Sequence, residues 1–270
     1  MSIIAMSREL GSLGTVIGTR AAEQLGYKYI YQEITSDAAR DYEVLEEKLI
    51  RVVEKAPRFL EKLRGNFRPY QAFIQTQVFK AAQRDNVILV GRWSTLLLKD
   101  ISHVIRVRVT APEVVRAERV MKMMQVGMEK ALELVRENDL DRGTRMEQLY
   151  GVDWKAAHLY DLVVNTEKVS VDVGAELIVD LARKEEYRAT QESKRKLDNL
   201  TIASTIRAAL KAHRSTRDVD IDIQANNGEV VMMGVVGSES EKKTVERIAR
   251  TIKGIRKLET HLNVLKYRPR

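Results

Sequence analysis

Residues of the types that bind phosphate are gathered near the N-terminus. The stretch SRELGSLGTVIG (residues 7–18) follows a short apolar run and contains three glycines, at positions 11, 14 and 18. Glycines let backbone N–H groups turn toward an anion, and the start of a following helix adds a partial positive charge. The stretch therefore predicts a phosphate-binding loop, although a plain strand-to-helix connection contains glycines too.

This loop differs from the usual P-loop in one respect. The P-loop pattern is GxxxxGK[ST], and the stretch has no lysine. The Ser7 hydroxyl and the Arg8 guanidinium stand at its beginning and are able to make the phosphate contacts that the lysine usually makes. We therefore expect Arg8 to supply the missing charge.

A second candidate is the charged stretch RENDLDRGTR (residues 136–145). On a helix, Arg142 and Arg145 project from one face because they are three residues apart. Two arginines on a mobile segment can neutralise the charge that develops on a transferred phosphoryl group. An exposed helix stabilised by charge pairs has the same pattern, so the residues alone leave both interpretations open.

A third candidate is Arg92, which follows Gly91 at the end of the apolar run NVILV (residues 86–90). A continuous apolar run of this length is typical of a strand buried on both faces of a parallel sheet. Ligands bind outside the carboxyl ends of such strands. Arg92 is thus placed to grip a phosphate, or it is a solvated loop residue.

The elements that must hold these residues predict an α/β fold. An apolar run at 3–6, the glycine loop, a helix closed by Gly26 and a strand at 27–31 make a βαβ unit, which indicates a parallel sheet. Residues 35–84 are predicted to be mostly helical, with breaks at Pro57 and at 64–70. The remaining predicted elements of this part are strands at 103–109 and 161–165 and helices at 112–126, 129–137 and 170–183.

The pattern changes after residues 184–196, which contain almost no apolar side chains. The segments beyond them predict a small α-β-β-α-β domain, with a helix at 199–212, strands at 219–225 and 229–236, a helix from the Ser238 cap to about 253, and a strand at 258–265. We place the N-terminal domain at residues 1–184, a linker at 185–196 and the C-terminal domain at 197–267.

Composition excludes several classes of protein. The 270 residues include no cysteine, and the four histidines are too far apart in sequence to predict a metal centre. No leader and no apolar run long enough to span a bilayer is visible, so we expect a cytoplasmic protein. Residues 195–270 have 16 Lys and Arg against 9 Asp and Glu, which accounts for nearly all of the net charge of +8. This charge predicts an acidic partner or a solvated basic surface.

The ordered series of N-terminal segments resembles the nucleoside monophosphate kinases, and most closely cytidylate kinase and its cytidylate-kinase-like relatives. The resemblance extends from residue 3 to about 183 and rests on AMSRELGSLGTVIG, VGR (90–92), VTAPEVVRAERV (109–120), RENDLDRGTR, YGVDW and YDLVVNT (160–166). It implies a P-loop kinase-like three-layer fold with a parallel sheet. It also implies transfer of the ATP γ-phosphoryl group to CMP or dCMP, with Mg²⁺.

The resemblance also implies roles for individual residues. Those carried over join Ser7 and Arg8 in a nucleotide- and phosphate-binding set, and they are Gly11, Ser12, Gly14, Gly18 and Arg92. A lid that closes over both substrates would contain Asp139, Arg142 and Arg145. Two positions differ from cytidylate kinases, because Gly14 replaces the P-loop lysine and Trp93 replaces the aspartate after Arg92. Nucleotide binding is therefore better supported than turnover.

The C-terminal segment, from about residue 197 to 265, resembles a BON domain. The carrying features are the α-β-β-α-β order and the stretches VVMMGVVGSESEKKTVERIA and KGIRKLETHLNVL. The resemblance implies a non-enzymatic module that binds an anionic phospholipid or a protein partner, more than nucleic acid. The expected function is thus a nucleoside monophosphate kinase-like phosphotransferase with a basic binding domain. The alternative is an inactive nucleotide-binding sensor whose C-terminal domain binds anionic lipid or another macromolecule.

Overall fold

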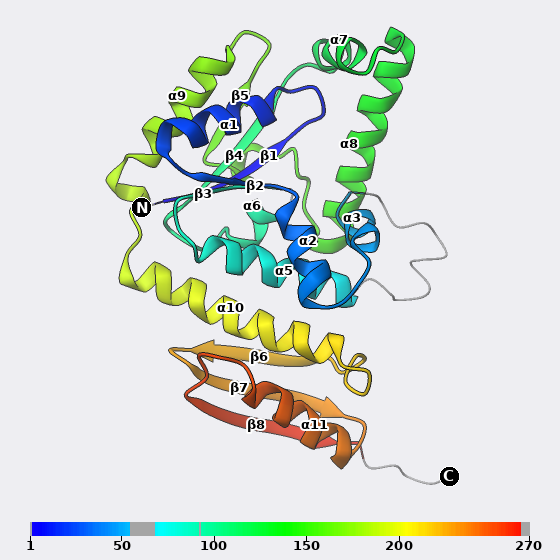
Figure 1. The fold of residues 1–270 in the computed structure, drawn as a ribbon, viewed down its shortest axis with the longest axis vertical. Helices are drawn as coiled ribbons and strands as arrows, with labels where there is room; N and C mark the ends of the chain where they lie inside the picture. Colours follow the sequence, from blue (N-terminus) through cyan, green and yellow to red (C-terminus); the bar gives the residue numbers. More distant parts are fainter. Residues whose placement is uncertain (1, 55–67, 92, 266–270) are drawn as a thin grey trace.

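The N-terminal part of the chain is built on one parallel sheet. The computed structural model describes residues 2–54, 68–91 and 93–265. Five parallel strands have the order β2-β3-β1-β4-β5 (Figure 1). They are β1 (Ile3–Arg8), β2 (Lys28–Ile30), β3 (Val87–Val90), β4 (Val104–Thr110) and β5 (Leu162–Asn165). The central strand, β1, leads directly into the glycine loop.

Helices cover both faces of this sheet and give the three layers that the sequence predicts. On one face lie α1 (Gly14–Leu25) and α9 (Val171–Ala182), packed against Ile4 and Met6 of β1. Ile3 and Ala5, which alternate with them, face the opposite layer. The helices of that layer are α2 (Glu33–Asp41), α3 (Glu46–Glu54), α5 (Arg68–Ala82) and α6 (Ser94–Leu97).

A helical hairpin stands beside the sheet and consists of α7 (Glu113–Met124) and α8 (Met128–Tyr150) (Figure 1). The sequence predicts that the second helix ends near residue 137, and this prediction was wrong. The charged stretch 136–145 continues α8 because its inward face is buried, including Arg142, Arg145 and the following Met146. Arginine stems can cover apolar surface in this way, so a charged sequence does not end a helix.

The C-terminal domain has the predicted α-β-β-α-β order. Its elements are α10 (Gln191–Ala212), β6 (Ile221–Asn226), β7 (Glu229–Val236), α11 (Glu239–Arg250) and β8 (Lys257–Val264). The sheet order is β6-β7-β8, with β6 antiparallel and β8 parallel to β7. Helix α10 begins eight residues earlier than predicted, within the segment that we assign to a linker. A capping box starts it, since Thr190 and Ser193 each accept the other's backbone N–H at 3.1 and 2.9 Å.

Helix α10 lies between the two domains and packs against both (Figure 1). One face places Leu197 and Ala208 in the same core cluster as α5, and the other places Ile206 and Leu210 in the core of the small sheet. The hydroxyl of Thr76 on α5 donates to the carbonyl of Ser204 at 2.9 Å. The C-terminal domain is therefore docked on the N-terminal domain through its own first helix. None of the helices within the described ranges is long and apolar enough to cross a membrane.

Candidate active site

The loop between β1 and α1 is a tight turn that ends at an open helix N-terminus. The backbone N–H and the hydroxyl of Ser12 both donate to the carbonyl of Glu9, at 3.2 and 2.8 Å. Leu13 has a left-handed backbone (φ 62°), a conformation that usually favours glycine. No described side chain caps α1, so its first N–H groups remain available to an anion.

Arg8 lies beside the position of the missing lysine. When GxxxxGK[ST] is laid on residues 8–15, Arg8 takes the first glycine position, Gly14 the lysine position and Thr15 the hydroxyl position. A Cβ atom at Gly14 would lie only 2.6 Å from Cβ of Arg8 and 3.4 Å from its Cδ. The stem of Arg8 thus fills the space above the start of α1, and its guanidinium lies 4.5 Å from the ring centre of Tyr31.

Several residues of the predicted phosphate-binding set lie behind the loop instead of at its surface. Ser7 and Ser12 are buried, and the Ser12 hydroxyl is used within the turn. A Cβ atom at Gly18 would overlap Met6 and Tyr29, so this glycine allows α1 to approach the sheet. Gly11 has φ 78°, and a Cβ there would lie 2.5 Å from the carbonyl oxygen of Arg116 on α7. These four positions therefore shape the loop.

A buried ionic cluster lies next to the loop and includes Glu9, the residue that follows β1. The Glu9 carboxylate, only 4% exposed, binds Arg108 of β4 at 2.5 Å and Arg116 of α7 at 3.2 Å. Thr110 donates to it at 2.6 Å, and Arg116 also makes a bidentate pair with Asp139 at 2.9 and 3.1 Å. Buried charges are tolerated when they are paired in this way. The cluster ties β1, β4, α7 and α8 together around the loop.

Sequence reasoning missed this cluster, although β4 contains a signal for it. Arg106 and Arg108 alternate in an otherwise apolar strand, and charges on a strand of a parallel sheet need partners. Arg106 pairs with Asp161, and Arg108 with Glu9. Arg119 on α7 was missed as well, and its guanidinium donates to the carbonyl of Gly11 at 3.2 Å and so also holds the loop.

The three residues predicted for the lid have separate roles. Arg142 and Arg145 share the inward face of α8, as predicted from their spacing, but both are buried in a regular helix. Arg142 donates to the carbonyl of Arg8 and lies 5.3 Å from the Trp154 ring centre, so it reaches the start of the loop. Arg145 donates to the carbonyl of Arg51 on α3 at 3.3 Å. Asp139 is paired with Arg116 and with Lys155 and therefore carries no uncompensated charge.

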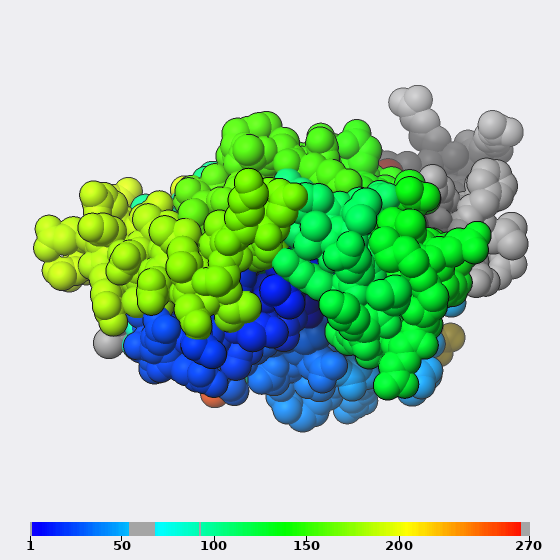
Figure 2. Space-filling model, turned by 90° about the horizontal axis from the view of Figure 1, so that it is seen from above, coloured from blue at the N-terminus to red at the C-terminus, as the bar shows by residue number. Residues whose placement is uncertain are grey.

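The loop is open to solvent on the side of the strand carboxyl ends. Figure 2 shows the N-terminal segment in blue at the base of a hollow, between the green hairpin α7–α8 and the yellow-green region that includes α9. Thr15 in the first turn of α1 is exposed. A polyphosphate therefore has access to the α1 N-terminus.

A cavity of about 300 Å³ lies at the ends of β2 and β3. Its walls come from α2, α3, α5 and the segment that joins β3 to α6. They are mostly apolar and include Trp93. The polar residues that line it are Tyr31, Gln32, Thr35, Glu46 and Ser94. Apolar walls with a few polar groups, in a volume of roughly 300–1,000 Å³, are typical of small-molecule sites. Tyr31 lines the cavity and its ring also contacts the Arg8 guanidinium, so Arg8 at the start of the glycine loop packs against a residue of the cavity wall.

Two details of the cavity concern the predicted acceptor-binding residues. Arg92 lies outside the described residues. Trp93 is buried, packs edge-on against Tyr150 with ring centres 6.4 Å apart, and has no hydrogen-bond partner for its indole N–H among the described residues. Trp93 stands at the position of the aspartate in the cytidylate kinase pattern, and it forms part of the apolar wall of the cavity. Glu46, held by the Thr35 hydroxyl at 2.9 Å, is the carboxylate that lines this cavity.

Sheet order, glycine loop and neighbouring cavity together define a protein of the P-loop kinase-like class. Residues 3–168 match the cytidylate kinase-like family, and the chain belongs to that family. Residues 198–266 match the BON domain.

Named relatives agree with the family assignment, and a solved structure agrees with the fold. The chain is 27% identical to cytidylate kinase of Pyrococcus horikoshii over 62% of its own length and 81% of that protein, and 30% identical to cytidylate kinase of Methanopyrus kandleri over 60% and 83%. The crystal structure of an uncharacterized protein from Eubacterium ventriosum has the same fold, with a TM-score of 0.54 and 19% identity, over 68% of this chain and all of that one.

Proposed function

We propose that the chain is a nucleoside monophosphate kinase-like phosphotransferase that moves the γ-phosphoryl group of ATP to CMP, dCMP or a related acceptor. The observation that carries the proposal is the position of Arg8. Its stem lies beside the uncapped start of α1, and its guanidinium contacts Tyr31 of the cavity wall, so one cation is close to the places proposed for the donor and the acceptor phosphates.

The reaction needs positioning and charge neutralisation more than acid–base chemistry. A phosphate oxygen of the acceptor attacks the γ-phosphorus, the bond from that phosphorus to the bridging oxygen breaks, and ADP leaves with the electron pair. The acceptor enters as a dianion, so no general base is required. Arg8 and the α1 N-terminus would hold the donor phosphates, and Arg142 would stabilise the charge on the transferred group.

The described residues are better suited to binding the phosphates of ATP than to forming a metal site of their own. They contain no group of three or more potential metal ligands, and the carboxylates of Glu9 and Asp139 are already paired with arginines. Mg²⁺ would therefore enter with ATP, held mainly by its phosphates, with the Thr15 hydroxyl as the protein group at the P-loop hydroxyl position.

The test is to incubate the full chain with ATP, Mg²⁺ and a panel of nucleoside monophosphates and to measure the diphosphates formed. We expect ADP to accumulate together with one diphosphate product. If none forms with any acceptor, at enzyme concentrations near those of the substrates, phosphoryl transfer is ruled out as the function.

The alternative is a nucleotide-binding protein without turnover whose C-terminal domain binds anionic lipid or another macromolecule. The observation that favours it is the absence of a lysine at position 14 together with the compensated charges of Glu9, Arg116 and Asp139. Calorimetry distinguishes the two, because a sensor binds ATP or CMP and yet yields no product in the panel assay. Absence of nucleotide binding at millimolar concentration contradicts both.

A further inference from the structure

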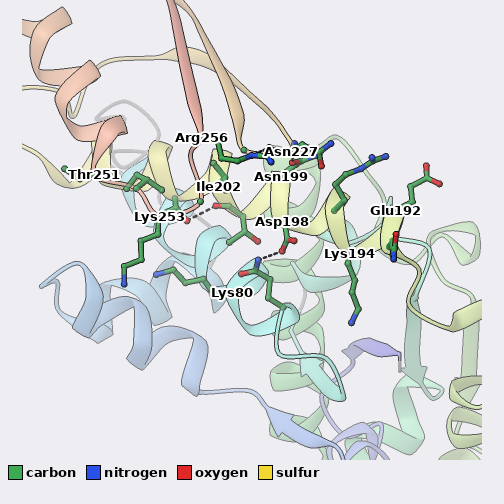
Figure 3. A pocket seen from close by; sticks show the side chains of 18 residues that line it. Lys80, Glu192, Lys194, Asp198, Asn199, Ile202, Asn227, Thr251, Lys253 and Arg256 are labelled. Atoms are coloured by element: carbon green, nitrogen blue, oxygen red, sulfur yellow. Dashed lines mark hydrogen bonds between the residues drawn. The ribbon is translucent and has the colours of Figure 1, made fainter.

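A second, larger hollow lies between the two domains, away from the candidate active site. It has a volume of about 1270 Å³ and is formed by the end of α5, by α10, and by two turns of the C-terminal domain (Figure 3). The first turn contains Asn227 and Gly228, and the second runs from Thr251 to Arg256. We call this hollow the interdomain groove.

The interdomain groove has an excess of positive charge. The basic residues that line it are Lys80, Lys194, Arg195, Lys253 and Arg256, and the acidic ones are Glu192 and Asp198. Asp198 already accepts a hydrogen bond from Gln83 at 2.5 Å. An anion entering the groove therefore meets more cations than carboxylates.

Two of these cations have neither a hydrogen bond nor a counter-charge within the described structure. Lys80 is paired with Asp41 at 3.1 Å and Lys194 with Asp85 at 2.9 Å, both outside the groove lining. Arg256 donates to the carbonyl of Asn227. Arg195 and Lys253 make neither a hydrogen bond nor an ion pair with any described residue. Figure 3 shows the ammonium groups of Lys80 and Lys253 on the same side of the groove, although they come from different domains.

We propose that the interdomain groove binds a soluble small molecule that carries two or more phosphate groups. Arg195 on α10 and Lys253 in the α11–β8 turn bind the phosphates. Ile202 and Ile252 contact the less polar part of the ligand. The groove is a concave space between two docked domains and is lined by residues of both. We therefore assign the ligand as a free molecule, and binding to a lipid headgroup in a bilayer is the competing outcome that the test distinguishes.

The test uses inorganic tripolyphosphate as the probe and hydrogen exchange of the full chain as the readout. We expect added tripolyphosphate to protect amides at 227–228 and 251–256 at least severalfold. In an Arg195→Glu/Lys253→Glu variant this protection should disappear, whereas any protection of the glycine loop (9–15) should remain. A Lys243→Glu/Arg247→Glu variant has the same change in charge on an exposed part of α11 outside the groove, and it should behave as the unmodified chain does.

Two outcomes would overturn the proposal. One is unchanged exchange at both turns in the presence of millimolar tripolyphosphate, whatever happens at the glycine loop. The other is sedimentation with vesicles that contain phosphatidic acid, lost in Arg195→Glu/Lys253→Glu, without protection by tripolyphosphate. Because the glycine loop is read separately, failure at the groove is distinguishable from failure of the kinase proposal.

Discussion

The side chain of Arg8 lies across Gly14, so that even a Cβ atom at position 14 would come within 2.6 Å of Cβ of Arg8. Two departures from the P-loop pattern, Arg8 for its first glycine and Gly14 for its lysine, are therefore coupled in space, and we interpret them as one exchange. Compared with that pattern, a cationic side chain stands at the end of β1 instead of at the start of α1, and the residue beside it, Gly14, has no side chain. The cation is kept, and it lies over Tyr31, a residue of the cavity wall.

This relationship predicts the behaviour of three variants. Arg8→Ala should weaken ATP binding roughly ten- to a hundredfold, because a charged hydrogen-bond donor to phosphate is worth about 1.5–3 kcal/mol. Gly14→Lys alone should destabilise the fold by about 1–3 kcal/mol through overpacking. Arg8→Gly/Gly14→Lys, which rebuilds the usual pattern, should recover much of both losses. Calorimetry with ATP and thermal unfolding measure these effects.

Arg20, on the exposed side of α1, provides the control for Arg8. It is paired with Asp172 of α9, and Arg20→Ala should leave ATP binding within about twofold of the parent. Equal losses for Arg8→Ala and Arg20→Ala would mean that the loop is an ordinary turn. A double variant no better than the worse single variant would contradict the exchange.

Arg142 is expected to act on the transferred group. Arg142→Ala should lower kcat about a hundredfold, since removing one preorganised donor to a developing charge costs roughly that much, with a smaller change in the KM of ATP. Arg136→Ala is the matched control because Arg136 is exposed on the same helix and pairs with Glu113, and it should lower kcat less than twofold. Steady-state kinetics check both, and similar losses would assign Arg142 a purely structural role.

The acceptor cavity predicts a selective effect of Glu46. Glu46→Gln should raise the KM of the monophosphate about tenfold and leave that of ATP unchanged, because a carboxylate accepts a stronger hydrogen bond from a base N–H than an amide does. Glu47, next in sequence and exposed, gives the control Glu47→Gln. The two KM values are measured with saturating partner substrate. An equal rise in both would place Glu46 outside the acceptor site.

The parts of the fold that the sequence predicts are those with a local pattern. The apolar run 86–90, the glycine loop and the Gly26 cap each depend on neighbouring residues, and all three are present. The Glu9–Arg108 pair joins residues 99 positions apart, and nothing in a short window reveals that they meet. Gly18 shows a related limit, because a glycine needed for close packing against Met6 has the same sequence signature as one near a phosphate.

The start of α10 escaped prediction for a different reason. Helix α10 has two buried faces, one in each hydrophobic core, so its apolar residues do not repeat along a single face. Its first turns are also strongly charged. The prediction that follows is that Leu197→Ala destabilises the N-terminal domain by about 2–5 kcal/mol, as loss of a buried leucine does. Both tryptophans, Trp93 and Trp154, lie in that domain, so their fluorescence during denaturation reports it alone. Exposed Lys196→Ala is the control, and no shift for Leu197→Ala would mean that the domains are only tethered.

The buried His103 makes stability depend on pH. It lies at the start of β4 with no solvent exposure, and neither ring nitrogen has a hydrogen-bond partner among the described residues. Burial lowers its pKa, against a smaller opposing effect of Asp85, whose carboxylate is 3.7 Å away. The unfolded chain therefore binds a proton near the ordinary histidine pKa of about 6.5, while the folded chain binds it only at lower pH.

The contribution of His103 is thus fully present above about pH 6.5 and is lost as the pH falls, by up to about 1.4 kcal/mol per pH unit. His103→Gln should flatten the pH dependence of the free energy of unfolding between about pH 6.5 and 5, even if the variant is less stable overall. His158, which is exposed, gives the control His158→Gln and should leave the slope unchanged. Urea denaturation at several pH values measures the slopes, and equal slopes for His103→Gln and the parent would show that His103 is protonated equally in both states.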